Sequence, residues 1–130
     1  MVKAKVEIDG LSNRIIGAAI EVHKSLGPGL LESAYEQCLC SELQFQGIEY
    51  ARQVALPVSY RQVTLDCGYR LDIVVEDSII LELKAVESLA PIHDAQLLTY
   101  LKLSDLKLGL LLNFNVPYMR NGIKRIVNGL

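Results

Sequence analysis

Apolar residues recur at three- and four-residue spacing in the first third of the chain, which is the pattern of amphipathic helices. The first stripe follows Ser12, a plausible N-cap, and should end at Leu26, because glycine and proline at positions 27–29 interrupt a helical backbone. A second stripe covers residues 30–46, and Gly47 follows it as a C′ glycine. The pattern therefore predicts two helices before any strand.

The middle of the chain changes to runs of β-branched and apolar residues, which are typical of strands. Residues 48–60 read as one extended strand in which Pro57 indicates an edge position or an irregularity. Residues 63–76 continue as one or two strands, residues 76–78 form a short hairpin turn, and residues 79–85 form the next strand. The short connections predict antiparallel neighbours.

The last third predicts a helix and a strand. Pro91 opens the helix at the first helical position, which proline prefers, and the helix runs to about Leu103. Residues 107–114 read as a final buried strand, with or without another over residues 122–127. A helix between two strands implies a parallel return. The whole order predicts an α/β (α+β) fold with a mixed central sheet flanked by helices, in a single domain over residues 1–130.

Three charged residues interrupt strands that should be buried. They are Asp72, Glu82 and Lys84. An ionised group in such surroundings is costly unless something compensates it. Strand geometry places Glu82 and Lys84 on one face, about 6.6 Å apart. Two acids and an amine on a sheet predict a divalent-metal site with a cationic helper. The alternative is a structural ion-pair network, which is the weaker explanation because buried pairs stabilise little.

Composition narrows the class of protein. The 130 residues are 51% apolar and 22% charged, as in globular chains. The net charge of −2 argues against a non-specific nucleic-acid coat, although active-site acids lower the total in a nuclease. No apolar run reaches the roughly 18 residues of a membrane span. Three cysteines without a disulfide framework indicate reduced thiols, and we expect a cytoplasmic protein that does not associate with membranes.

The ordered charged and polar residues resemble the PD-(D/E)xK nuclease superfamily. More narrowly, Gly29-x-x-Glu32-x-x-Tyr35 resembles the GxxExxY proteins, a prokaryotic branch of that superfamily. Further matches are Gln53, the segment Tyr69-Arg70-Leu71-Asp72 and the segment 96–102. The resemblance extends from about Ile15 to Val127 and implies a restriction-endonuclease-like core. Leu71 stands where the superfamily name expects a proline, at a position that varies among its members.

The resemblance implies a metal centre. Asp72 would be the central ligand, Glu82 the second and the backbone carbonyl of Leu83 the third, while Glu32 would reach the metal directly or through water. Oxygen ligands suit Mg²⁺ or Mn²⁺. Lys84 would hold or activate the attacking water and stabilise the transition state. For Glu32 the alternative is an exposed first-turn acid favoured by the helix dipole.

A second group of residues would support the lysine or contact the substrate. Gln96 and Tyr100 resemble the Gln-x-x-x-Tyr signature of exonuclease-like members of the superfamily. His93 lies on the same helical stripe. Tyr35 lies on the same face as Glu32 and would orient Glu32 or contact the substrate. The alternatives are the polar shoulder of an amphipathic helix, a capping role for His93 and a packed aromatic at Tyr35.

These residues predict a metal-dependent phosphodiesterase that hydrolyses DNA, in preference to RNA, by a metal-activated water. No covalent intermediate is expected, because no cysteine or serine lies beside a convincing base. The alternative is a catalytically silent module of the same fold that binds nucleic acid or a protein partner. A third reading is a nuclease subunit that requires a homodimer or a partner subunit.

Overall fold

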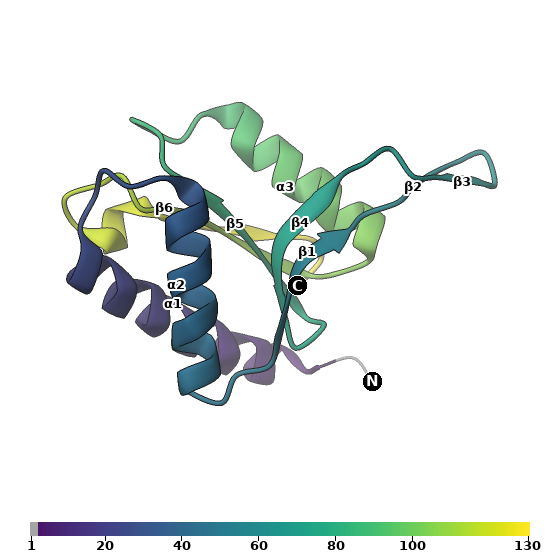
Figure 1. Ribbon diagram of the computed structural model, residues 1–130. Helices are drawn as coiled ribbons and strands as arrows, with labels where there is room; N and C mark the ends of the chain where they lie inside the picture. Colours follow the sequence, from purple (N-terminus) through teal and green to yellow (C-terminus); the bar gives the residue numbers. More distant parts are fainter. Residues whose placement is uncertain (1–2) are drawn as a thin grey trace.

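The computed structural model describes residues 3–130, which form a central sheet with helices on both faces (Figure 1). The elements in chain order are α1 (Lys5–Leu26), α2 (Glu32–Phe45), β1 (Tyr50–Ala55), β2 (Val58–Tyr60), β3 (Val63–Leu65), β4 (Arg70–Val75), β5 (Ile79–Lys84), α3 (Pro91–Ser104), β6 (Leu108–Asn113), the 3-10 helix η1 (Met119–Gly122) and β7 (Ile123–Val127).

The main sheet is mixed and five-stranded, in the order β1-β4-β5-β6-β7. Its neighbours are antiparallel except β5 and β6, which are parallel and joined by α3. Helices α1 and α2 cover one face and α3 covers the other (Figure 1). This arrangement confirms the predicted α/β (α+β) fold class with its mixed central sheet, which is consistent with a restriction-endonuclease-like core.

The two faces of the sheet bury separate apolar clusters. Along β5, Ile79, Leu81 and Leu83 belong to the larger cluster beneath α1 and α2, while Ile80 belongs to the smaller cluster beneath α3. Successive side chains of a strand point to opposite faces. The alternation therefore places Glu82 and Lys84 on the α3 side of β5.

The start of the first helix was predicted wrongly. Helix α1 begins at Lys5, and Ser12 is a buried residue inside it rather than an N-cap. Buried Ile8 and Leu11 extend the apolar stripe toward the N-terminus, and the Ala4 N–H donates to Oε1 of Glu7 at 3.1 Å. The helix ends at Leu26 as predicted, before a glycine with a φ of 71°.

One predicted strand is divided into two. Residues 48–60, predicted as a single strand, form β1 and β2, because Pro57 interrupts the ladder. Residues 63–76, predicted as one or two strands, form two, β3 and β4. The hairpin between β4 and β5 is confirmed: Glu76 and Asp77 both have left-handed φ values, of 48° and 51°, as a tight hairpin turn requires. Strand β7 is present as well.

Strands β2 and β3 form a two-stranded arm that projects from the body of the molecule (Figure 1). Its pairs are Val58↔Leu65, Ser59↔Thr64 and Tyr60↔Val63. Residues 59–70 are all exposed. At the base of the arm, β1 and β4 remain paired as far as Ala55↔Arg70. The arm therefore extends the β1–β4 hairpin and does not change the register in which β1 and β4 pair.

Candidate active site

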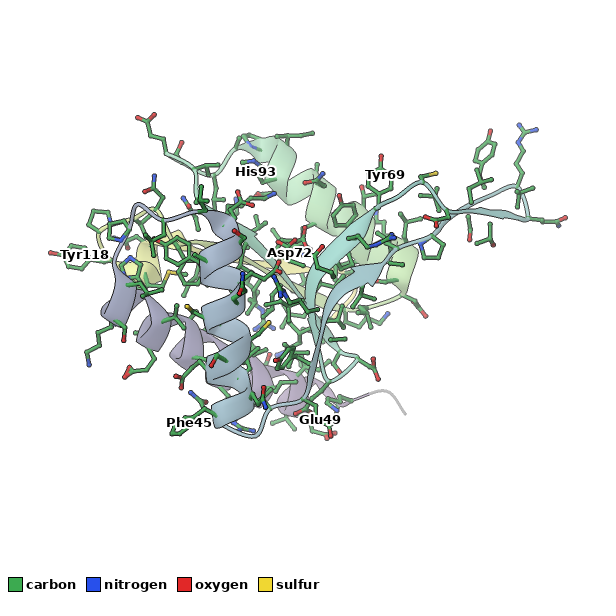
Figure 2. All side chains as sticks on the ribbon, in the orientation of Figure 1. Phe45, Glu49, Tyr69, Asp72, His93 and Tyr118 are labelled. Atoms are coloured by element: carbon green, nitrogen blue, oxygen red, sulfur yellow. The ribbon has the colours of Figure 1, made fainter. Side chains whose placement is uncertain are left out.

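Strands β4 and β5 separate at Asp72, and two carboxylates occupy the opening. The backbone pairs of this ladder stop at Ile73↔Leu81. Beyond them, the Asp72 N–H donates to Oε2 of Glu82 at 2.9 Å, and the Leu83 N–H donates to Oδ2 of Asp72 at 2.9 Å. Side chains thus replace the ladder hydrogen bonds at this point. Figure 2 shows Asp72 at the centre of the molecule, between α2 and α3.

Burial and nearby negative charges disfavour the charged forms of both acids. Glu82 is only 6% exposed, and its burial, followed by the charge of Asp72, raises its pKa to about 8. The pKa of Asp72 is raised first by burial and then by the charges of Glu36 and Glu32, while the Leu83 N–H and the Lys84 ammonium oppose the rise. Without a cation, Glu82 therefore keeps a proton at neutral pH.

The free oxygens of this pair suit a hard cation. No donor within residues 3–130 hydrogen-bonds Oδ1 of Asp72 or Oε1 of Glu82. Over the same residues, no three His, Cys, Asp or Glu side chains come together as a metal cluster. Two carboxylates with solvent completing the shell fit Mg²⁺ or Mn²⁺, which retain several waters, and do not fit a closed tetrahedral zinc site.

Lys84 lies beside the acids without pairing with them. Its charge lowers the pKa of both Asp72 and Glu82. None of the ion pairs within the described part of the chain involves any of these three residues. The structure thus brings the three predicted residues together, and within residues 3–130 they form no ion-pair network, which was the structural alternative.

Glu32 approaches the same opening from the α2 side. It is the first residue of α2, it is exposed, and its Oε2 accepts a hydrogen bond from the Ala85 N–H at 3.4 Å, just after the end of β5. Its charge contributes to the raised pKa of Asp72. Because Glu32 forms no three-acid cluster with Asp72 and Glu82 in residues 3–130, a direct bond to the same metal is not supported by this geometry. A contact through water remains a proposal.

Tyr35 does not face the solvent, and the predicted contact with substrate is wrong for this structure. The side chain is fully buried and stacks on Phe114, with 4.6 Å between ring centroids. Its hydroxyl donates to the Gly27 carbonyl at 2.6 Å and accepts from the Leu30 N–H at 3.1 Å. Tyr35 therefore fixes the turn that leads into α2, and so fixes the position of Glu32.

The polar residues of α3 separate into two groups. Nδ1 of His93 accepts a hydrogen bond from the Ala90 N–H at 3.0 Å, so His93 caps the helix, and its contact with substrate stays a prediction. Tyr100 is only 9% exposed, and its pKa is raised by burial and then by the charge of Glu82, so it lies near the acid pair. Gln96 is exposed, and no hydrogen bond joins it to Lys84 among the described residues.

A second buried acid, Glu36, was missed by the sequence reasoning. It is 6% exposed on α2, its Oε2 accepts from Nε of Arg52, and its Oε1 accepts from Nε2 of Gln53 at 2.8 Å. The charge of Glu36 contributes to the raised pKa of both Asp72 and Glu82. The available signal was a glutamate directly after Tyr35, on the buried stripe of a helix, where a charged residue needs a partner.

A mixed five-stranded sheet flanked by helices, which opens between two strands, is consistent with a restriction-endonuclease-like fold. The family model of the PD-(D/E)XK nuclease superfamily matches residues 9–126. The chain therefore belongs to the PD-(D/E)XK nuclease superfamily, whose members generally use divalent metals and act on nucleic acids. Comparisons with curated proteins and with solved structures gave no significant match. No helix within residues 3–130 is both long enough and apolar enough to span a membrane.

Proposed function

We propose that this protein is a metal-dependent nuclease that hydrolyses the phosphodiester backbone of DNA in preference to RNA. The observation that carries the proposal is the acid pair: Asp72 and Glu82 each have one oxygen held by a backbone N–H and one oxygen without a hydrogen-bond partner among residues 3–130. Such a pair is pre-organised for a cation, and Lys84 supplies a positive charge beside it.

Each residue then has a distinct task. Asp72 and Glu82 would hold Mg²⁺ or Mn²⁺, with the Leu83 carbonyl as a third ligand and Glu32 acting through water. When bound, the cation neutralises phosphate charge and lowers the pKa of water. Lys84 orients the attacking water and stabilises the charge that develops on the phosphate oxygens. Tyr100 and Gln96, on α3, would contact the nucleic-acid strand.

The test is cleavage of matched DNA and RNA oligonucleotides with Mg²⁺, with Mn²⁺ and with a chelator. We expect Asp72→Ala, Glu82→Ala and Lys84→Ala each to reduce the rate by at least about 10²-fold, because each removes charge stabilisation from the transition state. Glu49→Ala and Lys102→Ala are matched controls, since both residues are exposed. Wild-type cleavage by the three site variants would show that the acid pair is not the active site.

A catalytically silent binding module is the second candidate. It is favoured by the lack of a three-acid metal cluster within residues 3–130. Titration with Mn²⁺ separates the two candidates when combined with the cleavage assay. Cation binding that depends on Asp72 and Glu82, together with cleavage, supports the nuclease, whereas nucleic-acid binding without either supports the silent module.

A further inference from the structure

Two consecutive residues of β1 contact the same carboxylate, which a regular strand does not allow. Nε of Arg52 and Nε2 of Gln53 both donate to Glu36, on α2. Side chains of neighbouring strand residues normally point to opposite faces of the sheet. The exception here has a backbone cause, because Gln53 has a left-handed φ of 54°. That conformation turns its side chain to the α2 side, where Arg52 already points.

The turned residue lies opposite Asp72. The flanking pairs of the β1–β4 ladder are Arg52↔Ile73 and Val54↔Leu71, and the ladder skips the position between them, occupied by Gln53 and Asp72. Residues directly opposite in a regular antiparallel pair place their Cβ atoms about 5 Å apart on the same face. A regular backbone at Gln53 would therefore bring its side chain against the Asp72 carboxylate. The left-handed turn removes a side chain from that space.

The left-handed conformation of Gln53 needs support, because residues other than glycine, asparagine and aspartate adopt it rarely. Glu36 provides the support: it is 6% exposed and accepts from the Gln53 amide at 2.8 Å. Arg52 compensates the buried charge of Glu36 from the neighbouring position. The three residues come from two elements, α2 and β1, that pack against each other.

We infer that Glu36, Arg52 and Gln53 form a positioning brace, which holds β1 turned at Gln53 and keeps the space beside Asp72 free for the cation and the phosphate. The inference rests on the proposed function for the nature of the bound group. The brace itself touches neither cation nor substrate. It acts through the placement of Asp72.

The backbone at position 53 can be changed while the fold is kept. Gln53→Val introduces a β-branched residue that resists the left-handed conformation, whereas Gln53→Gly accepts it without support. We expect Gln53→Val to weaken Mn²⁺ binding by about tenfold or more in calorimetric titration, within the range found when groups that support metal ligands are removed. Gln53→Gly should bind Mn²⁺ like the wild type. Ala51→Val is the matched control, at an exposed position of the same strand.

A rescue experiment distinguishes positioning from general stability. Glu36→Leu removes both contacts of the brace without substituting a residue of β1, and it should weaken Mn²⁺ binding as Gln53→Val does. Adding Gln53→Gly to Glu36→Leu should restore the affinity, because glycine adopts the turn without steric cost and has no side chain to enter the space beside Asp72. A purely structural role for Glu36 predicts no rescue. The same pair of variants decides the question if Gln53→Val fails to fold.

Amide hydrogen exchange in the metal-free protein provides a readout that does not depend on the proposed function. We expect Gln53→Val and Glu36→Leu to accelerate exchange at the Asp72 and Leu83 amides, which are bound to the carboxylates, and to leave Ile80 protected. Wild-type protection and wild-type Mn²⁺ affinity in both variants would overturn the brace. If the wild-type protein binds no Mn²⁺, the proposed function fails, and the exchange comparison still decides the brace.

Discussion

At the scale of single residues, Glu82 links the site to the stability of the protein. Its pKa of about 8 in the folded protein lies above the ordinary value of 4.5. Between these values the folded protein binds more protons than the unfolded chain, so the contribution of Glu82 to stability is complete below about pH 4.5 and is lost as the pH rises toward 8. A salt-bridged acid shows the opposite pH dependence, because its pKa is lowered on folding and its contribution to stability is lost as the pH falls.

We therefore predict that the metal-free protein becomes less stable by a few kcal/mol as the pH rises through this window. Glu82→Gln should remove most of this dependence, because glutamine does not titrate. Chemical denaturation at a series of pH values in the presence of a chelator measures the effect. If the free energy of unfolding changed equally with pH in the wild type and in Glu82→Gln, Glu82 would be ionised in the folded protein.

Tyr35 gives a residue-scale prediction about the turn that precedes α2. Tyr35→Phe keeps the stacking on Phe114 but leaves the Gly27 carbonyl and the Leu30 N–H without their partner. We expect a loss of about 1–3 kcal/mol in the free energy of unfolding, measured by urea denaturation. The KM for oligonucleotide should change little. A raised KM at full stability would instead return Tyr35 to a role in substrate contact.

The charged residues within apolar strands made Asp72, Glu82 and Lys84 predictable from the sequence. Residues whose role depends on tertiary hydrogen bonds were not predictable in the same way. The sequence shows Tyr35 and His93 as polar groups on helices, but not that the turn at Gly27 or the Ala90 N–H uses their hydrogen-bonding atoms. The left-handed backbone at Gln53 has no signal in the pattern, since glutamine is an ordinary strand residue.

At the scale of elements, local signals fixed the positions of several boundaries. Proline correctly marked the start of α3, because it restricts φ to a helical value. The glycine after α1 correctly marked the end of that helix, because it allows a left-handed φ. The start of α1 was missed because its first free N–H is bound by Glu7 and not by a serine, threonine or asparagine cap. The arm was missed because alternating residues predict strands but not which strand pairs with which.

The β2–β3 arm yields a prediction at this scale. Leu56 and Tyr69 close its base, where the Leu56 N–H donates to the Tyr69 carbonyl at 3.0 Å. Replacing residues 57–68 with Asn-Gly should give a tight hairpin between these two residues. We expect the free energy of unfolding to change by less than about 1 kcal/mol, because the removed segment is almost entirely exposed. Unfolding of the shortened protein would show that the arm stabilises the body.

At the scale of the whole molecule, the main sheet lies between two apolar clusters and contributes residues to both. Strands β4, β5 and β6 contribute alternate residues to each cluster. Neither cluster can be exposed without disrupting the strands that build the other. We therefore propose that residues 1–130 form a single domain that unfolds as one unit.

Calorimetry tests this proposal together with the metal site. We expect one thermal transition, with equal calorimetric and van't Hoff enthalpies, for the metal-free protein. Excess Mn²⁺ at pH 8 should raise the Tm of the wild type, because a ligand that binds only the folded state stabilises it. The Tm of Asp72→Ala should not respond. Two separate transitions would contradict the single domain, and an equal shift in both proteins would place the cation elsewhere.

The separation of β4 and β5 implies a trade-off between durability and activity. A sheet is most stable when its ladder is continuous and its interior is apolar, yet here the buried Glu82 and the half-buried Asp72 complete the hydrogen bonds of two strands. Apolar residues at 72 and 82 would remove the cost of burying those acids. A laboratory screen for thermal stability alone should therefore enrich such replacements and yield proteins that are more stable but inactive. The two acids, and the opening that they occupy between β4 and β5, should therefore be retained only where selection also acts on activity.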